Sequence, residues 1–192
     1  ENIRKAVGGE RKILVAVKAD GYGHGAIEVA KMSEKTGVDW LGIATVPEAI
    51  ELRQAGITLP ILKFSPLFAE EMEEAIKNRV TVAVCDSENV RQLNEAAKKL
   101  NIVAEVHIKI ETGMGRIGVQ IDQAKELAGQ IIDDCPFLKL NGAMTHLPVS
   151  DEASKTFTQR QIERFKKAVK EIEEEHEFKF ELVHCANSGG IL

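Results

Sequence analysis

Apolar residues along this chain fall into short continuous runs that alternate with longer segments of helical period. Runs this short and this apolar are typical of strands that are buried on both faces of a sheet. The segments between them repeat apolar residues every three or four positions, which predicts helices with one buried face. The seven expected strands are residues 13–17, 40–44, 61–64, 81–84, 104–110, 138–144 and 181–185.

The helical segments are marked by their apolar faces and by residues suited to helix ends. Four helices are expected around residues 72–76, 90–100, 124–131 and 162–172. Ser87 is expected to cap the second of these at its N-terminus. A shorter helix is expected over residues 47–54, because proline suits the first helical turn and Gly56 suits its end.

Strands that alternate with helices predict right-handed βαβ units and a parallel sheet. Periodicity alone leaves two architectures open, a doubly wound open sheet and a barrel. The residues with candidate chemistry follow four different strands, and such strand ends converge only if the sheet closes. The expected fold is therefore α/β, a TIM-like (β/α)8 barrel with about seven of its eight strands. Because seven strands would leave two open edges, we expect residues 1–192 to be one barrel domain truncated at both ends.

Composition restricts the classes of function. The chain is 44% hydrophobic and 29% charged, with a net charge of −5, so it has no basic surface suited to nucleic acid or an anionic membrane. We expect no membrane contact and no signal peptide, since no apolar run approaches the length of a membrane span. Cys85, Cys135 and Cys185 are too far apart for a zinc site and odd in number, which favours reduced cysteines, with Cys85 and Cys185 in the core, and a cytoplasmic protein.

The first segment with candidate chemistry runs from Val17 to Gly25, directly after the first expected strand. A lysine such as Lys18 that leaves an apolar strand is partly desolvated, which favours the neutral amine that reacts with an aldehyde cofactor. Three glycines in five residues let the backbone approach an anion, and Tyr22 can donate a hydrogen bond to a phosphate. The alternative is a glycine-rich turn with an exposed lysine.

The second segment, residues 109–118, lies at the end of the fifth expected strand. Arg116 is flanked by glycines and can direct its planar guanidinium toward a phenolate or a carboxylate. Lys109 lies on the strand itself and, if it points inward, needs a partner or a modification. The alternative for Arg116 is a salt-bridged loop.

Two further candidates follow the sixth and seventh expected strands. His146 ends the sixth strand, although a single histidine in such a place is more often structural. Asn187 and Ser188 follow the seventh strand, where a hydroxyl and the backbone amides of a helix start can hold a phosphate. The alternative for Ser188 is a simple helix cap. No metalloprotease, nucleotide-binding or serine hydrolase motif is present, and no metal site is expected.

Taken in order along nearly the whole chain, these four segments resemble the pyridoxal-phosphate-binding barrel domain of the alanine racemase family, whose members are fold-type III enzymes. The resemblance implies that Lys18 forms a Schiff base with pyridoxal 5′-phosphate and that Tyr22 contacts its phosphate. It implies that Arg116 contacts the 3′-oxygen of the cofactor, and in many members Lys109 carries a carbamate that positions this arginine. Glu111 stands where the family more often has aspartate.

The same resemblance implies that His146 packs near the cofactor ring and that Asn187 and Ser188 belong to the phosphate site. Residues 148–149 depart from the small residues often found in that loop. Lys18, Arg116 and His146 are thus the expected catalytic residues.

The implied activity is interconversion of L-alanine and D-alanine by two bases, which supplies D-alanine for peptidoglycan. Lys18 would be one base, and the other would be a tyrosine of the partner subunit in a homodimer. That tyrosine belongs to a C-terminal β-domain that we expect to lie outside this chain, so the chain alone is expected to be inactive. The alternatives are a serine or broad-specificity racemase, a decarboxylase of the same barrel type, or a non-catalytic pyridoxal-phosphate-binding protein.

Overall fold

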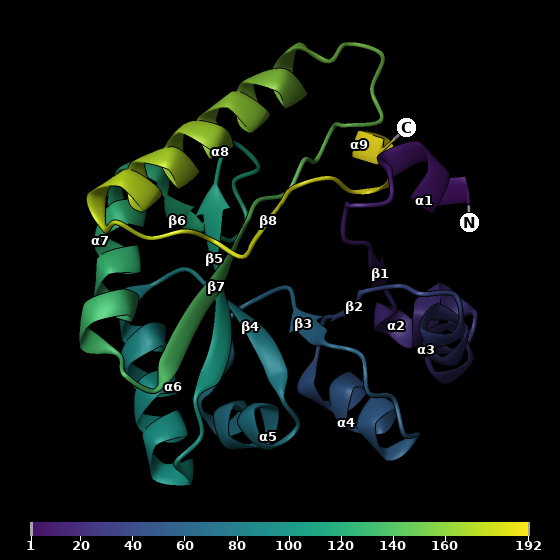
Figure 1. Cartoon of the computed structure of the whole chain (residues 1–192), viewed down its shortest axis with the longest axis horizontal. Coiled ribbons are helices and arrows are strands. Elements are labelled where there is room, and N and C mark those ends of the chain that lie inside the picture. The colour runs from purple at the N-terminus through teal and green to yellow at the C-terminus, as the bar shows by residue number, and fades with distance from the viewer. Residues whose placement is uncertain (1, 192) are drawn as a thin grey trace. The chain divides into compact units, whose positions relative to one another are not determined.

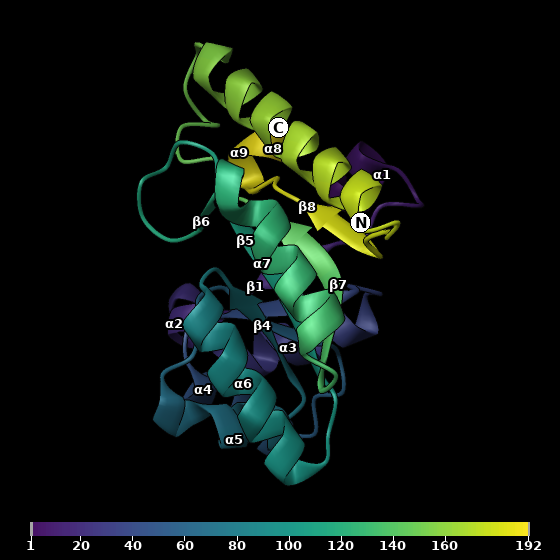
Figure 2. The same ribbon diagram turned by 90° about the vertical axis from the view of Figure 1, so that its left-hand side faces the viewer.

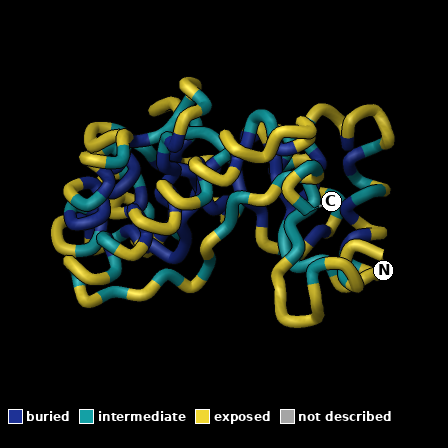
Figure 3. Tube along the Cα trace, turned by 90° about the horizontal axis from the view of Figure 1, so that it is seen from above, coloured by how far each residue is buried: buried dark blue, intermediate teal, exposed yellow. Residues whose placement is uncertain are grey.

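The computed structural model describes residues 2–191, which form two compact units, the first ending at Ala83 and the second beginning at Val84. Both units alternate strands with helices (Figure 1). In each of them the buried residues lie inside and the exposed residues lie on the outer turns (Figure 3). The fold class is therefore α/β, as the hydrophobic pattern predicts.

Unit 1 is built on four parallel strands that pair in sequence order, β1 with β2, β2 with β3 and β3 with β4. Its elements are α1 (Asn2–Val7), β1 (Leu14–Ala16), α2 (Lys18–Gly23), α3 (Ala26–Lys35), β2 (Trp40–Ile43), α4 (Val46–Gln54), β3 (Ile61–Lys63), η1 (Ala69–Glu71), α5 (Met72–Lys77) and β4 (Val80–Val84). The Phe64 ring packs directly against Gly42, so that a Cβ there would lie 2.1 Å from its Cζ and the ring would have to move. A glycine within β2 thus permits this close packing.

Unit 2 contains three parallel strands in the order β5, β7, β8, and a two-residue strand, β6, that also pairs with β5. Its elements are α6 (Ser87–Leu100), β5 (Ala104–Glu111), β6 (Val119–Gln120), η2 (Ile121–Gln123), α7 (Ala124–Gly129), η3 (Gln130–Asp134), β7 (Leu138–Met144), α8 (Thr156–Glu175), β8 (Leu182–His184) and α9 (Ser188–Ile191). Helices α7 and α8 pack against each other (Figure 2). At the end of α8, the His176 Nε2 lies 3.0 Å from the Lys125 carbonyl oxygen.

All seven expected strands are present, each within two residues of its predicted bounds. One cap prediction is wrong: the N-cap of α6 is Asp86, whose carboxylate accepts a hydrogen bond from the Asn89 amide at 2.8 Å. Asp86 has the extended backbone that an N-cap requires, whereas Ser87 is already helical and donates to Gln130.

The cysteine prediction needs a partial correction. The three thiols are free, as expected, but Cys85 and Cys185 are only half-buried and Cys135 is the buried one. Cys85 and Cys185 each follow the last residue of a strand, so neither is enclosed like a strand residue. Among residues 2–191 no helix is long and apolar enough to cross a membrane.

A pair of histidines joins β5 and β8, the strands on either side of β7. The Nδ1 atom of His107 on β5 lies 3.0 Å from Nε2 of His184 on β8, with the rings nearly edge to face. β7 lies between these strands, and a Cβ at Gly142 would lie 2.4 Å from the His107 ring. Burial lowers the pKa of His107 to about 3, with a further contribution from His184, and lowers the pKa of His184 to about 4.

This pair makes the stability of unit 2 depend on pH. In the unfolded chain both imidazoles titrate near pH 6.5, whereas in the folded chain they stay neutral until about pH 3 to 4. Between these values the unfolded state binds more protons, so the free energy of unfolding must fall as the pH falls. We expect a loss of about 2 kcal/mol per histidine at pH 5, measured by denaturant unfolding between pH 8 and 5.

A His107→Gln variant keeps a hydrogen-bonding side chain that does not titrate in this range. It is expected to lose roughly half of the pH dependence. His24→Gln, at an exposed position of unit 1, is the matched control and should behave like the unmodified chain. An unchanged pH profile in His107→Gln would contradict the assignment.

Candidate functional site

Lys18 is followed by a turn of the opposite hand to an ordinary helix. Residues 19–22 all have left-handed backbone angles, with φ between 50° and 61°. For Ala19, Asp20 and Tyr22 this conformation costs about 1–2 kcal/mol each, because Cβ approaches the following carbonyl. Only Gly21 adopts it without strain. Strain of this kind persists only where the surroundings impose it, and it is concentrated at functional sites.

The surroundings impose it here through hydrogen bonds to the backbone and to one side chain of the turn. The Ala19 amide donates to Oε1 of Glu48 on α4 at 2.7 Å, and the Ala26 amide donates to Oδ1 of Asp20 at 2.7 Å. Glu48 also receives the amides of Ala44 and Thr45 on its second oxygen, at 2.8 and 3.0 Å. Burial alone would raise the pKa of Glu48, but these three hydrogen bonds and one from the Thr45 side chain outweigh it and lower the pKa. One ionised carboxylate therefore holds the peptide next to Lys18.

The turn brings together the two residues predicted to bind the cofactor in unit 1. The Lys18 side chain is half-buried, and its Nζ lies 5.8 Å from the centre of the Tyr22 ring. Tyr22 itself is 62% exposed, so its hydroxyl is available to a ligand. A cation over an aromatic ring at this distance is a favourable contact.

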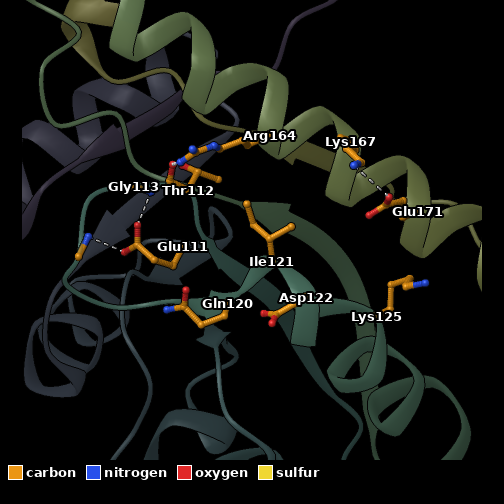
Figure 4. A pocket seen from close by; sticks show the side chains of 11 residues that line it. Glu111, Thr112, Gly113, Gln120, Ile121, Asp122, Lys125, Arg164, Lys167 and Glu171 are labelled. Carbon is orange, nitrogen blue, oxygen red and sulfur yellow. Dashed lines mark hydrogen bonds and ion pairs between the residues drawn. The ribbon is translucent and has the colours of Figure 1, made fainter.

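In unit 2 a second carboxylate organises the loop that carries Arg116. Glu111, the last residue of β5, receives the amides of Gly113 and Gly115 at 2.5 and 2.8 Å (Figure 4). It also receives the amide of Arg116 at 3.3 Å. Burial would raise the pKa of Glu111, but the hydrogen bonds from this loop lower it. The loop returns against the strand at Gly118, where a Cβ would lie 2.6 Å from the Glu111 amide nitrogen. The Arg116 guanidinium is exposed and forms no hydrogen bond or ion pair with the residues that the structure describes.

Lys109 lies on β5, and His146 lies just beyond the end of the neighbouring strand β7. His146 follows β7, is half-buried, and its carbonyl oxygen accepts a hydrogen bond from Nε2 of Gln161 at 3.2 Å. Lys109 lies on β5 and is 3% exposed, two residues after His107 and therefore on the same face of the strand. A lysine this deeply buried is unusual and needs compensating contacts.

The segment after β8 is held by its asparagine. The Asn187 side chain donates to the Leu147 carbonyl at 2.8 Å and accepts from Ser150 and from the Gly190 amide, at 2.5 and 3.0 Å. The bonds with Leu147 and Ser150 join the segment after β8 to the one after β7, and the bond from Gly190 lies within the segment after β8. Ser188 begins the short helix α9, and its exposed hydroxyl makes no hydrogen bond with the described residues. Ser188 thus remains available to a ligand, whereas Asn187 is engaged in holding the two loops.

A cavity of about 630 Å³ lies in unit 2, between the Glu111 loop and α8 (Figure 4). Its walls combine Glu111, Asp122 and Glu171 with Lys125, Arg164 and Lys167. Arg116, His146 and Ser188 do not line it. It is therefore an outer cavity beside the loop rather than a part of the predicted site.

The predicted residues are shared between the units. Lys18 and Tyr22 belong to unit 1, and the other five, Lys109, Arg116, His146, Asn187 and Ser188, belong to unit 2. Two residues with evident influence on them were not predicted, Glu48 and Gln161. The spacing Thr45-x-x-Glu48 is a capping box and could have drawn attention to Glu48. Gln161 carries no comparable signal, since it lies within an amphipathic helix.

The chain is similar to known proteins along its whole length. The family model described as alanine racemase, N-terminal domain, matches residues 1–192. The chain is 46% identical to the alanine racemase of Cutibacterium acnes and 44% identical to that of Treponema denticola, over 99% and 100% of its length. It spans about half the length of these relatives, 50% and 51%.

A solved structure of alanine racemase from Clostridium difficile 630 superposes on the chain with a TM-score of 0.93 and 41% identity. The match covers 99% of this chain and 50% of that one. The alanine racemase of Streptomyces lavendulae, a producer of D-cycloserine, matches with a TM-score of 0.90 and 29% identity. The fold class expected from the sequence, an incomplete TIM-like barrel of the α/β class, is thereby confirmed. The chain belongs to the alanine racemase family and corresponds to its N-terminal domain.

Proposed function

We propose that this chain is the cofactor-binding barrel part of a pyridoxal-phosphate-dependent alanine racemase that interconverts L-alanine and D-alanine. The observation that carries the proposal is the strained turn after β1, in which Glu48 holds the peptide beside Lys18 and Tyr22 stays exposed. Such a turn is costly to form and useful only if the lysine must stand in one place.

The available side chains fit the chemistry of pyridoxal phosphate. The cofactor has an aldehyde, a phenolic oxygen and a phosphate, which call for an amine, a cation and hydroxyl donors. Lys18 offers the amine, and the guanidinium of Arg116 has no partner among the described residues. Tyr22 and Ser188 offer exposed hydroxyls. When bound, the cofactor supplies an electron sink that makes the Cα proton of an amino acid acidic.

The roles of the chain's own residues follow from this set. Lys18 Nζ would hold the cofactor through its aldehyde and, as a free amine, would take or return the Cα proton of the substrate on one face. Arg116 would donate hydrogen bonds to the phenolic oxygen, and Tyr22 and Ser188 would bind the phosphate. His146 would pack on the ring. Asn187 supports Ser188 through its contacts with Leu147 and Gly190.

Inversion needs a second base on the opposite face, since one base tends to return the proton to the side it left. We propose that this base is a tyrosine of the partner subunit in a homodimer, from a C-terminal β-domain beyond the matched half of the relatives. Buried Lys109 is the residue proposed to carry a carbamate that helps to position Arg116. We propose that the enzyme is cytoplasmic and that its role is to supply D-alanine for peptidoglycan.

The first test concerns Lys18. In the full-length protein carrying this chain, borohydride treatment after addition of pyridoxal phosphate should attach the cofactor to Lys18, as read by peptide mass spectrometry. Lys18→Ala should lose the label and the racemase activity, because it removes the amine proposed to react with the cofactor aldehyde. Lys31→Ala, on the exposed side of α3, is the control and should keep both. Equal labelling of Lys18→Ala at another lysine would overturn the assignment.

The second test concerns Glu48. Glu48→Gln places an NH2 group against one or more backbone amides that now donate to a carboxylate, so the turn loses at least one charge-assisted hydrogen bond. We expect a stability loss of about 1–3 kcal/mol and weaker cofactor binding, measured by thermal unfolding and by titration with pyridoxal phosphate. Glu51→Gln, exposed on the same helix, should change neither. A Glu48→Gln protein that binds the cofactor normally would contradict the role.

The third test concerns the 192-residue chain by itself. If the second base lies outside it, the chain should not racemise alanine, because loss of a positioned acid or base lowers rates by about 10²–10⁴. Only slow exchange of the Cα proton of one enantiomer is expected in deuterated solvent, measured separately for D-alanine and L-alanine. Fast interconversion of both enantiomers would refute the two-subunit arrangement.

A further inference from the structure

A glutamine is buried on the inner face of α8, among residues that are otherwise mostly apolar. Gln161 is 1% exposed, and its amide nitrogen donates to Oγ1 of Thr112 and to the carbonyl of His146, both at 3.2 Å. It is thus the side chain through which α8 reaches the ends of both β5 and β7. Burial of an amide is unfavourable unless its groups are hydrogen-bonded, and these two bonds satisfy its NH2 group.

The contacts continue as a chain of hydrogen bonds with one direction. The Thr145 hydroxyl lies 2.8 Å from the Ile110 carbonyl, which can only accept, so Thr145 must donate to it. The Thr112 hydroxyl, 2.8 Å from that of Thr145, must then donate to Thr145. Thr112 is left to accept from Gln161, as the geometry shows. Each hydroxyl donates once and accepts once, and both are buried.

This series of hydrogen bonds fixes two segments that carry predicted site residues. Thr112 directly follows Glu111, which holds the loop of Arg116, and Thr145 directly precedes His146. Thr112 and Thr145 are 1% and 4% exposed, and at such burial a broken hydrogen bond is not replaced by one to water. The end of β5 and the end of β7 are therefore held in one register by side chains as well as by the sheet.

Two neighbours of Gln161 on α8 support the same loop. Phe157 lies one turn before it, and a Cβ at Gly113 would lie 3.0 Å from its ring. Arg164 lies one turn after it and donates to the Thr112 carbonyl at 3.3 Å. Residues spaced by three and four positions share one helix face, so this face of α8 bears directly on the Arg116 loop.

Stability alone does not account for the glutamine. Its Oε1 atom is buried without a hydrogen-bond partner among the described residues, which is unfavourable by about 1–3 kcal/mol. A methionine of similar size would fill the space without that penalty. The residue is therefore better explained by what its two donated hydrogen bonds hold in place.

We propose that Gln161 is a positioning residue for the reaction, which sets the Arg116 loop and the His146 segment relative to each other through Thr112 and Thr145. The inference rests on the proposed function, since it requires Arg116 and His146 to act on the cofactor. Gln161, on helix α8, would thus act on the reaction without touching cofactor or substrate.

The test uses the full-length holoenzyme with three variants. Gln161→Met removes both donated bonds at similar volume, and Thr145→Val interrupts the same chain at a second point. Thr158→Val is the matched control, because Thr158 is buried on the same helix and its hydroxyl has no partner among the described residues. We expect kcat to fall about 10- to 100-fold in the first two variants, with a much smaller change in KM, and to stay unchanged in Thr158→Val.

A second readout separates this inference from the proposed function. Hydrogen exchange at the amides of residues 113–116 is measured in the cofactor-free protein, where it does not depend on any activity. Faster exchange in Gln161→Met and Thr145→Val, but not in Thr158→Val, supports the hydrogen-bond chain as what holds the Arg116 loop. This result would stand even if the unmodified protein proves not to be a racemase. Unchanged hydrogen exchange in Gln161→Met and Thr145→Val would show that the hydrogen-bond chain does not hold the Arg116 loop. Unchanged kcat in both variants of an active enzyme would overturn the positioning role. Should Gln161→Met fail to fold, Thr145→Val alone decides between these outcomes.

Discussion

The predicted site depends on one recurring interaction, a glutamate carboxylate that receives three backbone amides next to a cationic residue. In unit 1 Glu48 binds the amide that follows Lys18, and in unit 2 Glu111 binds the amide of Arg116 itself. An ionised carboxylate can accept several amides at once, and charge-assisted hydrogen bonds are stronger than neutral ones. The same interaction therefore fixes an irregular loop at a strand end in each unit, where no ladder hydrogen bonds are available.

The rigid arrangement at these strand ends lowers stability through backbone strain and through buried polar groups. Ala19, Asp20 and Tyr22 adopt left-handed angles, and Gln161 keeps an oxygen without a partner. Neither feature improves stability, and both lie beside residues assigned to the chemistry. Natural proteins tolerate such departures at functional sites, because a reacting group has to be held within a fraction of an ångström.

Much of this could be predicted from the sequence, because the strands are continuous apolar runs and the special residues stand directly after them. Lys18 and Tyr22 were found through their local motif, and they do meet in one turn. Gln161 was not, since its importance comes from partners 15 and 49 residues away. The N-cap of α6 was placed one residue late because Asp86 and Ser87 are both good capping residues, and only backbone geometry separates them. The two-residue strand β6 is too short to give any period.

The left-handed turn after β1 also orders events during folding. Its amide at Ala19 is bound by Glu48, 29 residues further along the chain, so local contacts supply only part of what holds the turn. A nascent chain that has not yet produced and docked α4 would leave residues 19–22 free to relax into ordinary conformations. The geometry of Lys18 is thus acquired late, after β2 and α4 are in place. An incompletely folded chain would present an ordinary lysine, and the reactive arrangement becomes a property of the folded unit alone.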